Sequence, residues 1–189
     1  MSVLIAYAST RSWNADVAGQ IADRLLKAGI AATARPVSQV ANLQQHRAVV
    51  LGSPLHDRDW LPEAVDFLCE FSEALLRLPV WLFSTEELGE VHSPRREPQG
   101  SVRMHESVAV ARARQTIRIR DHRHFEKSLA RGNRSQLRDL LLKVCGGSPD
   151  DRRDWREINE WAGQIARQLQ AIDHERERRR LHLSVRGKP

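Results

Sequence analysis

The sequence predicts a doubly wound, three-layer α/β sandwich on a five-stranded parallel sheet. Short, nearly continuous apolar runs at residues 3–7, 48–52 and 79–84 are typical of strands covered on both faces. Between these runs, apolar residues recur at helical spacing. Because strands that alternate with helices form βαβ units, we expect a parallel sheet with helices on both sides.

The chain of 189 residues is long enough for one domain with a sizeable core. We expect this domain to span residues 1–172 and the charged segment 173–189 to be a disordered tail. No apolar run approaches the roughly 20 residues of a membrane helix, and the first strand begins without a leader pattern. Cys69 and Cys145 lack the spacing of metal ligands, so we expect reduced thiols in a cytoplasmic protein.

The chain is strongly basic, with a net charge of +6 and an isoelectric point near 10.1. A solvated basic surface is the simplest interpretation. An anionic membrane surface is a candidate peripheral partner, because basic clusters are attracted to acidic lipids. Nucleic acid would be attracted in the same way, but no known nucleic-acid-binding motif accompanies the charge.

A polar loop separates the first apolar run from the first helical pattern. The loop carries hydroxyl and amide side chains, at Ser9, Thr10, Ser12 and Asn14. Apolar residues then recur every four positions up to Gly29, which predicts an amphipathic helix. Backbone N–H groups at the start of a helix attract anions. We therefore predict that this loop binds a phosphate group.

Two further segments are predicted to be strands near the edges of the sheet. Residues 31–37 are less apolar than the other runs, and residues 116–120 alternate apolar and basic side chains. Ligands of open parallel sheets bind outside the carboxyl ends of strands where the winding reverses. We therefore expect the polar loops 9–14 and 53–60 to face one crevice.

Four segments resemble the flavodoxin-like proteins. Residues 6–18 (AYASTRSWNADVA) resemble their phosphate loop, roughly Thr/Ser-x-Thr-Gly-x-Thr, and residues 52–64 (GSPLHDRDWLPEA) are similar to their Gly-Ser/Ala-Pro-x-Tyr-x-x-x-Trp loop and following helix. Residues 84–89 (STEELG) and 122–129 (HRHFEKSL) resemble later motifs of one branch. That branch comprises flavodoxin-domain proteins related to menaquinone-dependent protoporphyrinogen dehydrogenase.

The resemblance implies the flavodoxin strand order, with residues 3–7 between residues 31–37 and 48–52, and an FMN cofactor at the crevice. It implies an FMN oxidoreductase, with oxidation of protoporphyrinogen and a quinone acceptor as the specific reaction. A one-electron carrier and a flavin-free protein-interaction module remain as alternatives. No catalytic residue is predicted. The residues that the resemblance assigns to FMN are Ser9, Thr10, Arg11, Ser12, Trp13, Asn14, Ser53, Pro54, Leu55, His56, Trp60, Ser84, Thr85 and Gly89.

The sequence departs from the family pattern in three segments where the family has glycine. Ser12 replaces a glycine of the phosphate loop, and it would cost about 1 kcal/mol if the backbone there needs a positive φ. Glu86 and Glu87 replace a Gly-Pro pair, and Glu126 and Lys127 replace two glycines. These changes leave open whether FMN binding is retained.

Several side chains have alternative roles at this stage. Trp60 either covers the flavin or pins the following helix to the sheet. A helix after Pro62 is expected to bury Cys69 and Leu76, among others. His122 and His124 are expected to point to opposite faces of an extended segment, so no metal site is predicted.

Overall fold

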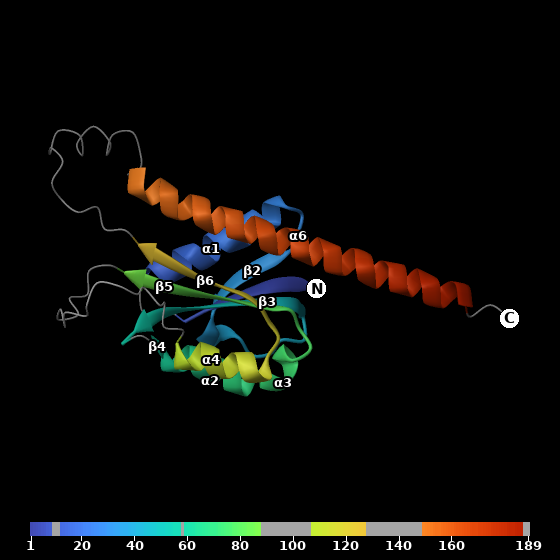
Figure 1. The fold of residues 1–189 in the computed structure, drawn as a ribbon, viewed down its shortest axis with the longest axis horizontal. Coiled ribbons are helices and arrows are strands. Elements are labelled where there is room, and N and C mark those ends of the chain that lie inside the picture. Colours follow the sequence, from blue (N-terminus) through green and yellow to red (C-terminus); the bar gives the residue numbers. More distant parts are fainter. Residues whose placement is uncertain (9–11, 58, 88–106, 128–148, 187–189) are drawn as a thin grey trace, which may run out of the picture.

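The computed structural model describes residues 1–8, 12–57, 59–87, 107–127 and 149–186 (Figure 1). The apolar segment 137–144, whose pattern predicts a short helix, lies outside these ranges. The elements in chain order are β1 (Ser2–Tyr7), α1 (Ser12–Lys27), β2 (Ala32–Pro36), the 3₁₀ helix η1 (Val37–Gln39), β3 (His46–His56), β4 (Asp59–Trp60), α2 (Pro62–Glu70), α3 (Ser72–Leu75), β5 (Val80–Glu87), α4 (Val108–Thr116), β6 (Ile119–Lys127) and α6 (Pro149–Arg186).

The strands form one sheet in the order β2-β1-β3-β5-β6, and all the neighbours in this order are parallel. The short strand β4 pairs antiparallel with the end of β3. Val3 of β1 lies between Ala32 of β2 and Ala48 of β3, which confirms the predicted central position of the first strand. The doubly wound fold class is therefore confirmed, with β2 and β6 as the outer strands of this order.

Helices cover both faces of the sheet (Figure 1). Helices α1 and α6 lie on one face, and α2, α3 and α4 lie on the other. Side chains of a strand alternate between the two faces, so Val3 and Ile5 join the core under α1 and α6, whereas Leu4 and Ala6 join the core on the opposite side. This double burial explains why the central strands are apolar at nearly every position.

Two glycines occupy positions where a side chain would be unfavourable. Gly29 ends the turn after α1 with φ +77°, a left-handed conformation that favours glycine. Gly52 of β3 pairs with Phe83 of β5, whose ring lies over the glycine. A Cβ atom at position 52 would be only 1.9 Å from Cζ of Phe83. The aromatic ring therefore occupies the volume that a side chain at position 52 would need.

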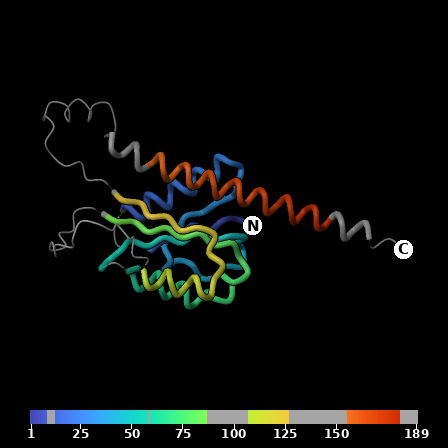
Figure 2. The backbone as a smooth tube through the Cα atoms, viewed as in Figure 1, coloured from blue at the N-terminus to red at the C-terminus, as the bar shows by residue number. Residues whose placement is uncertain are grey.

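Apolar residues at helical spacing from Trp155 to Leu169, with Asp154 as the expected cap, predict a terminal helix, and α6 differs from this prediction at both ends. It begins at Pro149, and it continues as helix to Arg186, where the sequence predicts a disordered tail from residue 173. Figure 2 shows this helix extending past the sheet. The ion pairs Arg47–Asp173 and Glu175–Arg179 stabilise the extension, the second of them between residues one turn apart. Its predicted apolar face is confirmed, since Ile158, Ala162, Ile165 and Leu169 are buried, with Trp155 packed against them.

Two other predictions are wrong for identifiable reasons. Cys69 lies on α2 but outside the face that buries Ala64, Phe67 and Leu68, so it is exposed. The helix after Pro62 breaks at Phe71, and Leu76 lies just beyond the end of α3, where it is also exposed. The last strand begins later than predicted, because residues through Thr116 belong to α4. The histidine segment that follows is therefore part of β6.

Candidate functional site

The carboxyl ends of β1, β3 and β5 meet at one edge of the sheet, and α1 begins there. The backbone N–H of Ala8 donates to the carbonyl of Gly52 at 2.8 Å, which joins the ends of β1 and β3. The first turn of α1 contains no acidic residue, so its positive end is not neutralised locally. An anionic group at the start of α1 would therefore meet a favourable potential.

Asn14 holds the three strand ends together. Its side chain is 3% exposed, and its Nδ2 donates to the carbonyl oxygens of Ala8 and, at 3.4 Å, of Gly52. Its Oδ1 accepts a hydrogen bond from Oγ1 of Thr85 at 3.3 Å. The amide therefore binds backbone and hydroxyl groups of the chain itself, which gives Asn14 and Thr85 a structural role. Their predicted contact with a cofactor is not tested by this arrangement.

Two buried serines act in a similar way. Oγ of Ser53 accepts a hydrogen bond from the backbone N–H of Leu61 at 3.0 Å and donates to the carbonyl of Pro54 at 2.9 Å. Oγ of Ser84 accepts a hydrogen bond from the indole N–H of Trp60 at 2.8 Å and lies 2.9 Å from Nε2 of His122. Both hydroxyls therefore shape the loop that connects β3, β4 and α2.

Trp60 is almost fully buried. Only 4% of the residue is exposed, and its ring packs into the core between the sheet and helices α2 and α4. With its N–H bonded to Ser84, the ring pins β4 to the sheet and is not available to cover a flavin. Of the two alternatives for Trp60, the structure agrees with the packing role.

His122 and His124 lie on the same face of β6, with ring centroids 4.5 Å apart. The expectation that they point to opposite faces is wrong, because residues two apart in a strand share a face. His122 also packs edge-on against Trp60, at a centroid distance of 6.2 Å. Within the described residues, no group of three or more His, Cys, Asp or Glu side chains is arranged to hold a metal ion.

Asp59 is a residue whose role sequence reasoning missed. Its Oδ1 accepts hydrogen bonds from Oγ of Ser107, the N-cap residue of α4, and from the backbone N–H groups of Trp60 and Ala109. Partial burial alone would raise the pKa of Asp59, but these hydrogen bonds and the charge of Arg112 hold it below its ordinary value. No local sequence signal connects position 59 to position 107, so only the structure reveals this contact.

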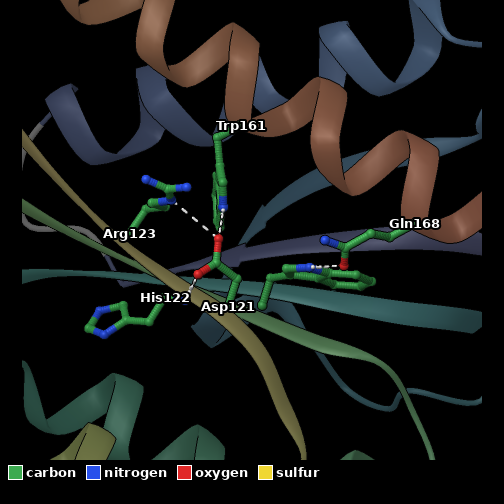
Figure 3. Close-up of polar contacts among 6 residues, drawn as sticks. Asp121, His122, Arg123, Trp161 and Gln168 are labelled. Carbon is green, nitrogen blue, oxygen red and sulfur yellow. Dashed lines mark hydrogen bonds and ion pairs between the residues drawn. The ribbon is translucent and has the colours of Figure 1, made fainter.

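Helix α6 is attached to the sheet by two indole hydrogen bonds. Trp161 donates to Oδ2 of Asp121 at 2.8 Å, as Figure 3 shows, and Trp81 donates to Oε1 of Gln168 at 3.2 Å. Partial burial would raise the pKa of Asp121, but hydrogen bonds from Trp161, Arg123 and the backbone of His122, together with the charge of Arg123, lower it. Packing of α6 against β6 therefore stabilises the ionised form of Asp121.

The comparisons with known proteins agree on the architecture. No protein-family model matches the chain, and no characterised protein matches it in sequence. A flavodoxin from the domain Archaea superposes with a TM-score of 0.60 at 12% identity, over 90% of this chain and 99% of the flavodoxin. A C101S mutant of the flavodoxin from Pseudomonas aeruginosa gives 0.57 at 13% identity, over 90% and 99%. The chain has a flavodoxin-like fold.

A larger protein also contains a region similar to this flavodoxin-like fold. Rubredoxin oxygen:oxidoreductase from the anaerobe Desulfovibrio gigas superposes with a TM-score of 0.55 at 15% identity. The match covers 90% of this chain but only 36% of that protein. At these identities, the likeness describes the fold alone.

The structure shows where several of the residues discussed in the sequence analysis lie. Trp13 is buried and packs edge-on against Trp155, at a centroid distance of 5.3 Å, so its ring contributes to packing. Ser12 is the first residue of α1, where the backbone is helical, so the strain expected from a positive φ does not apply. Glu86 is exposed to water. Ser9, Thr10, Arg11 and Gly89 lie outside the described residues.

The hairpin between β3 and β4 projects from the site edge. Pro54 and Leu55 are partly buried, whereas the His56 side chain is 65% exposed, with its Nε2 3.7 Å from Oδ2 of Asp57. Asp57 has φ +50°, a left-handed conformation that aspartate tolerates in turns. This loop is therefore a surface feature beside the strand ends, and the His56–Asp57 pair is largely exposed to water.

None of the helices in the described part of the chain is long and apolar enough to cross a membrane.

Proposed function

We propose that the chain is a flavodoxin-like redox protein that binds FMN at the carboxyl edge of its sheet. The observation that carries the proposal is the position of the α1 N-terminus, free of acidic residues in its first turn, at the ends of β1 and β3. The flavodoxins with the same fold support the choice of a flavin over other anionic cofactors.

The donor chemistry fits the phosphate end of FMN. In this proposal, backbone N–H groups at the start of α1 and the hydroxyls of Ser9, Thr10 and Ser12 bind the phosphate, and Arg11 adds a charge-assisted contact. The buried network of Asn14, Ser53, Ser84 and Thr85 positions the loops without contacting the cofactor. Bound FMN would supply the redox chemistry, and the protein would orient it and limit its access to water.

The finer proposal concerns the substrate. The resemblance to proteins related to menaquinone-dependent protoporphyrinogen dehydrogenase favours two-electron oxidation of protoporphyrinogen with a quinone as acceptor. A one-electron carrier is the alternative within the same class. Turnover of protoporphyrinogen with a soluble quinone would support the enzyme, whereas rapid single-electron exchange with a redox protein and no porphyrin product would support the carrier.

A flavin-free interaction module is the second candidate, and one observation favours it. The described polar side chains of the site are satisfied by the chain itself, and Trp60 is packed in the core instead of being available to a ring. Such a site needs no ligand to satisfy its buried polar groups.

An absorbance spectrum of the purified protein, followed by titration with FMN, distinguishes the two candidates. A flavin spectrum or saturable binding of FMN, with riboflavin binding much more weakly for lack of the phosphate, supports the redox protein. Failure to bind FMN at high concentration, with the protein folded by circular dichroism, rejects it and leaves the interaction module.

A further inference from the structure

A groove lies on the surface between α1 and α6, the two helices that cover the same face of the sheet (Figure 1). Its volume is about 630 Å³. It is lined mainly by polar and basic side chains around one glycine, at Arg24, Trp155, Arg156, Asn159, Glu160, Gly163, Gln164 and Arg167.

Two arginines from different helices converge over Gly163. A Cβ atom at this position would lie 3.7 Å from Nη1 of Arg167 and 3.8 Å from Nη2 of Arg24. Arg167 lies one turn after Gly163 on α6, so its side chain folds back over the glycine. Arg24 reaches the same point from the last turn of α1. The absence of a side chain at position 163 leaves both guanidinium groups accessible from the groove.

These two charges are not neutralised within the described part of the chain. Neither guanidinium group of Arg24 and Arg167 forms an ion pair or hydrogen bond there, whereas the third arginine, Arg156, pairs with Glu160 at 3.0 Å. Glu160 is the one carboxylate among the lining residues. Because like charges repel, two guanidinium groups near one point favour an anion between them.

Hydrogen bonds join the two helices beside the groove. Nε2 of Gln20 on α1 donates to Oδ1 of Asn159 on α6 at 2.8 Å, and Nδ2 of Asn159 donates to the carbonyl of Trp155 at 2.7 Å. These bonds fix the spacing of the two helices beside the arginines. The amide of Gln164 adds a further neutral donor to the lining.

We propose that this groove binds a small soluble molecule carrying a phosphate oxyanion, held between Arg24 and Arg167 over Gly163. Guanidinium groups are the usual partners of phosphate, because their planar donors match two of its oxygens. The proposed anion position is separate from the proposed FMN phosphate site, because Ser12 and Arg24 lie at opposite ends of α1, about 18 Å apart at 1.5 Å per residue. The other end of the groove, at Trp155, lies against Trp13 of the predicted FMN loop.

Calorimetric titration with pyrophosphate, at constant ionic strength, tests the proposal. The wild-type chain is compared with the double variant Arg24→Gln/Arg167→Gln and with Arg77→Gln/Arg118→Gln, which removes the same charge from exposed arginines elsewhere. We expect the first variant to bind about tenfold more weakly or worse and the control to stay within about twofold of wild type. Equal losses in both variants, or no saturable binding by the wild type, would overturn the proposal.

Two further measurements separate this site from other sources of phosphate binding. Thr10→Val, which alters the predicted FMN phosphate loop, is expected to leave pyrophosphate affinity unchanged, and a loss of binding there would assign the anion to the start of α1. The groove arginines should not affect sedimentation with phosphatidylglycerol vesicles. If they control vesicle binding but not pyrophosphate binding, the soluble-ligand proposal is wrong.

Gly163→Leu gives an independent test that changes no charge. A leucine side chain would extend between the two guanidinium groups, so we expect it to weaken pyrophosphate binding as strongly as the double arginine variant does. Gly163→Ala is the control, because its methyl group makes only ordinary van der Waals contacts with both arginines. Melting curves of both variants show whether the folded state is retained. Unchanged binding by a folded Gly163→Leu protein would contradict the proposed position of the anion.

Discussion

The indole N–H of Trp161 donates a hydrogen bond to Oδ2 of Asp121 at 2.8 Å, and this contact joins α6 to the outer strand β6 (Figure 3). Trp161 is 2% exposed and also packs edge-on against Phe83 and Phe125. The aromatic cluster and the carboxylate together position the first half of α6, which carries the groove arginine Arg167.

The Asp121 contact makes stability depend on pH in the acid range. The pKa of Asp121 is lowered in the folded state from its ordinary value of 3.8, so its contribution is complete above that value and is lost as the pH falls through the lower folded pKa. We expect Asp121→Asn to reduce stability by about 1 kcal/mol at neutral pH, and by progressively less below pH 3.8. Urea unfolding across this range, with the exposed Asp66→Asn as control, measures the difference. A constant difference at every pH would contradict the assignment.

Asp59 and Ser107 cap α4 together, so their effects should not add. We expect Asp59→Ala and Ser107→Ala each to reduce stability by about 0.5–2 kcal/mol, because both remove groups that satisfy N–H donors at the start of the helix. The double variant should lose less than the sum of the two, since the residues share one hydrogen bond. Hydrogen exchange at the first amides of α4 provides the local measurement. Strict additivity would mean that the pair does not act as a unit.

Substitution by alanine should change the stability of the protein in opposite directions at Gly52 and at Gly19. Gly52→Ala places a methyl group into the ring of Phe83 and should cost about 1–3 kcal/mol or more. Gly19 lies inside α1, and a Cβ atom there would have no neighbour within 4 Å, so Gly19→Ala should stabilise the protein by about 0.5–1 kcal/mol. Thermal or urea unfolding of both variants tests this. If Gly52→Ala is neutral, Phe83 moves aside more easily than its buried position suggests.

Valine substitutions at Thr10 and Thr85 should affect different quantities, FMN affinity at position 10 and the stability of the fold at position 85. In the proposed site, Thr10→Val removes a phosphate donor and weakens FMN by about 1–3 kcal/mol. Thr85→Val instead removes the partner of Oδ1 of Asn14 and should reduce stability by a similar amount, with FMN affinity little changed. Titration with FMN and urea unfolding of both variants provide the measurements. A loss of FMN affinity in Thr85→Val alone would place the cofactor contact on β5.

Ser12→Gly tests whether the loop has adapted to serine. Because Ser12 begins α1 with a helical backbone, glycine relieves no strain there, and we expect FMN affinity to stay flat or fall. Stability should fall by up to about 1 kcal/mol, since glycine gives the unfolded chain more freedom. FMN titration checks the first expectation and urea unfolding the second. Tighter FMN binding would instead support close approach of the backbone to the phosphate as the limiting factor.

The strand order was implied by the resemblance to flavodoxin-like proteins. The residue pattern by itself determined the apolar strands, the two outer strands and the apolar face of α6. These features follow from local periodicity: runs that are apolar at every position need cover on two faces, as Val3 and Leu4 show, and helical spacing specifies one buried stripe. The extent of α6 was not determined in this way. Its second half has no apolar stripe, and its Arg47–Asp173 contact joins residues far apart in the chain.

Only the tertiary structure decided what the polar residues of the site do. Asn14, Ser84 and Trp60 look like ligand-facing residues in sequence, because amide, hydroxyl and indole groups beside strand ends suit cofactor binding. Their hydrogen-bond partners lie on other strands, and a buried polar group must be satisfied wherever the fold brings a partner. The same reason applies to Arg24 and Arg167, whose approach over Gly163 exists only once α1 packs against α6.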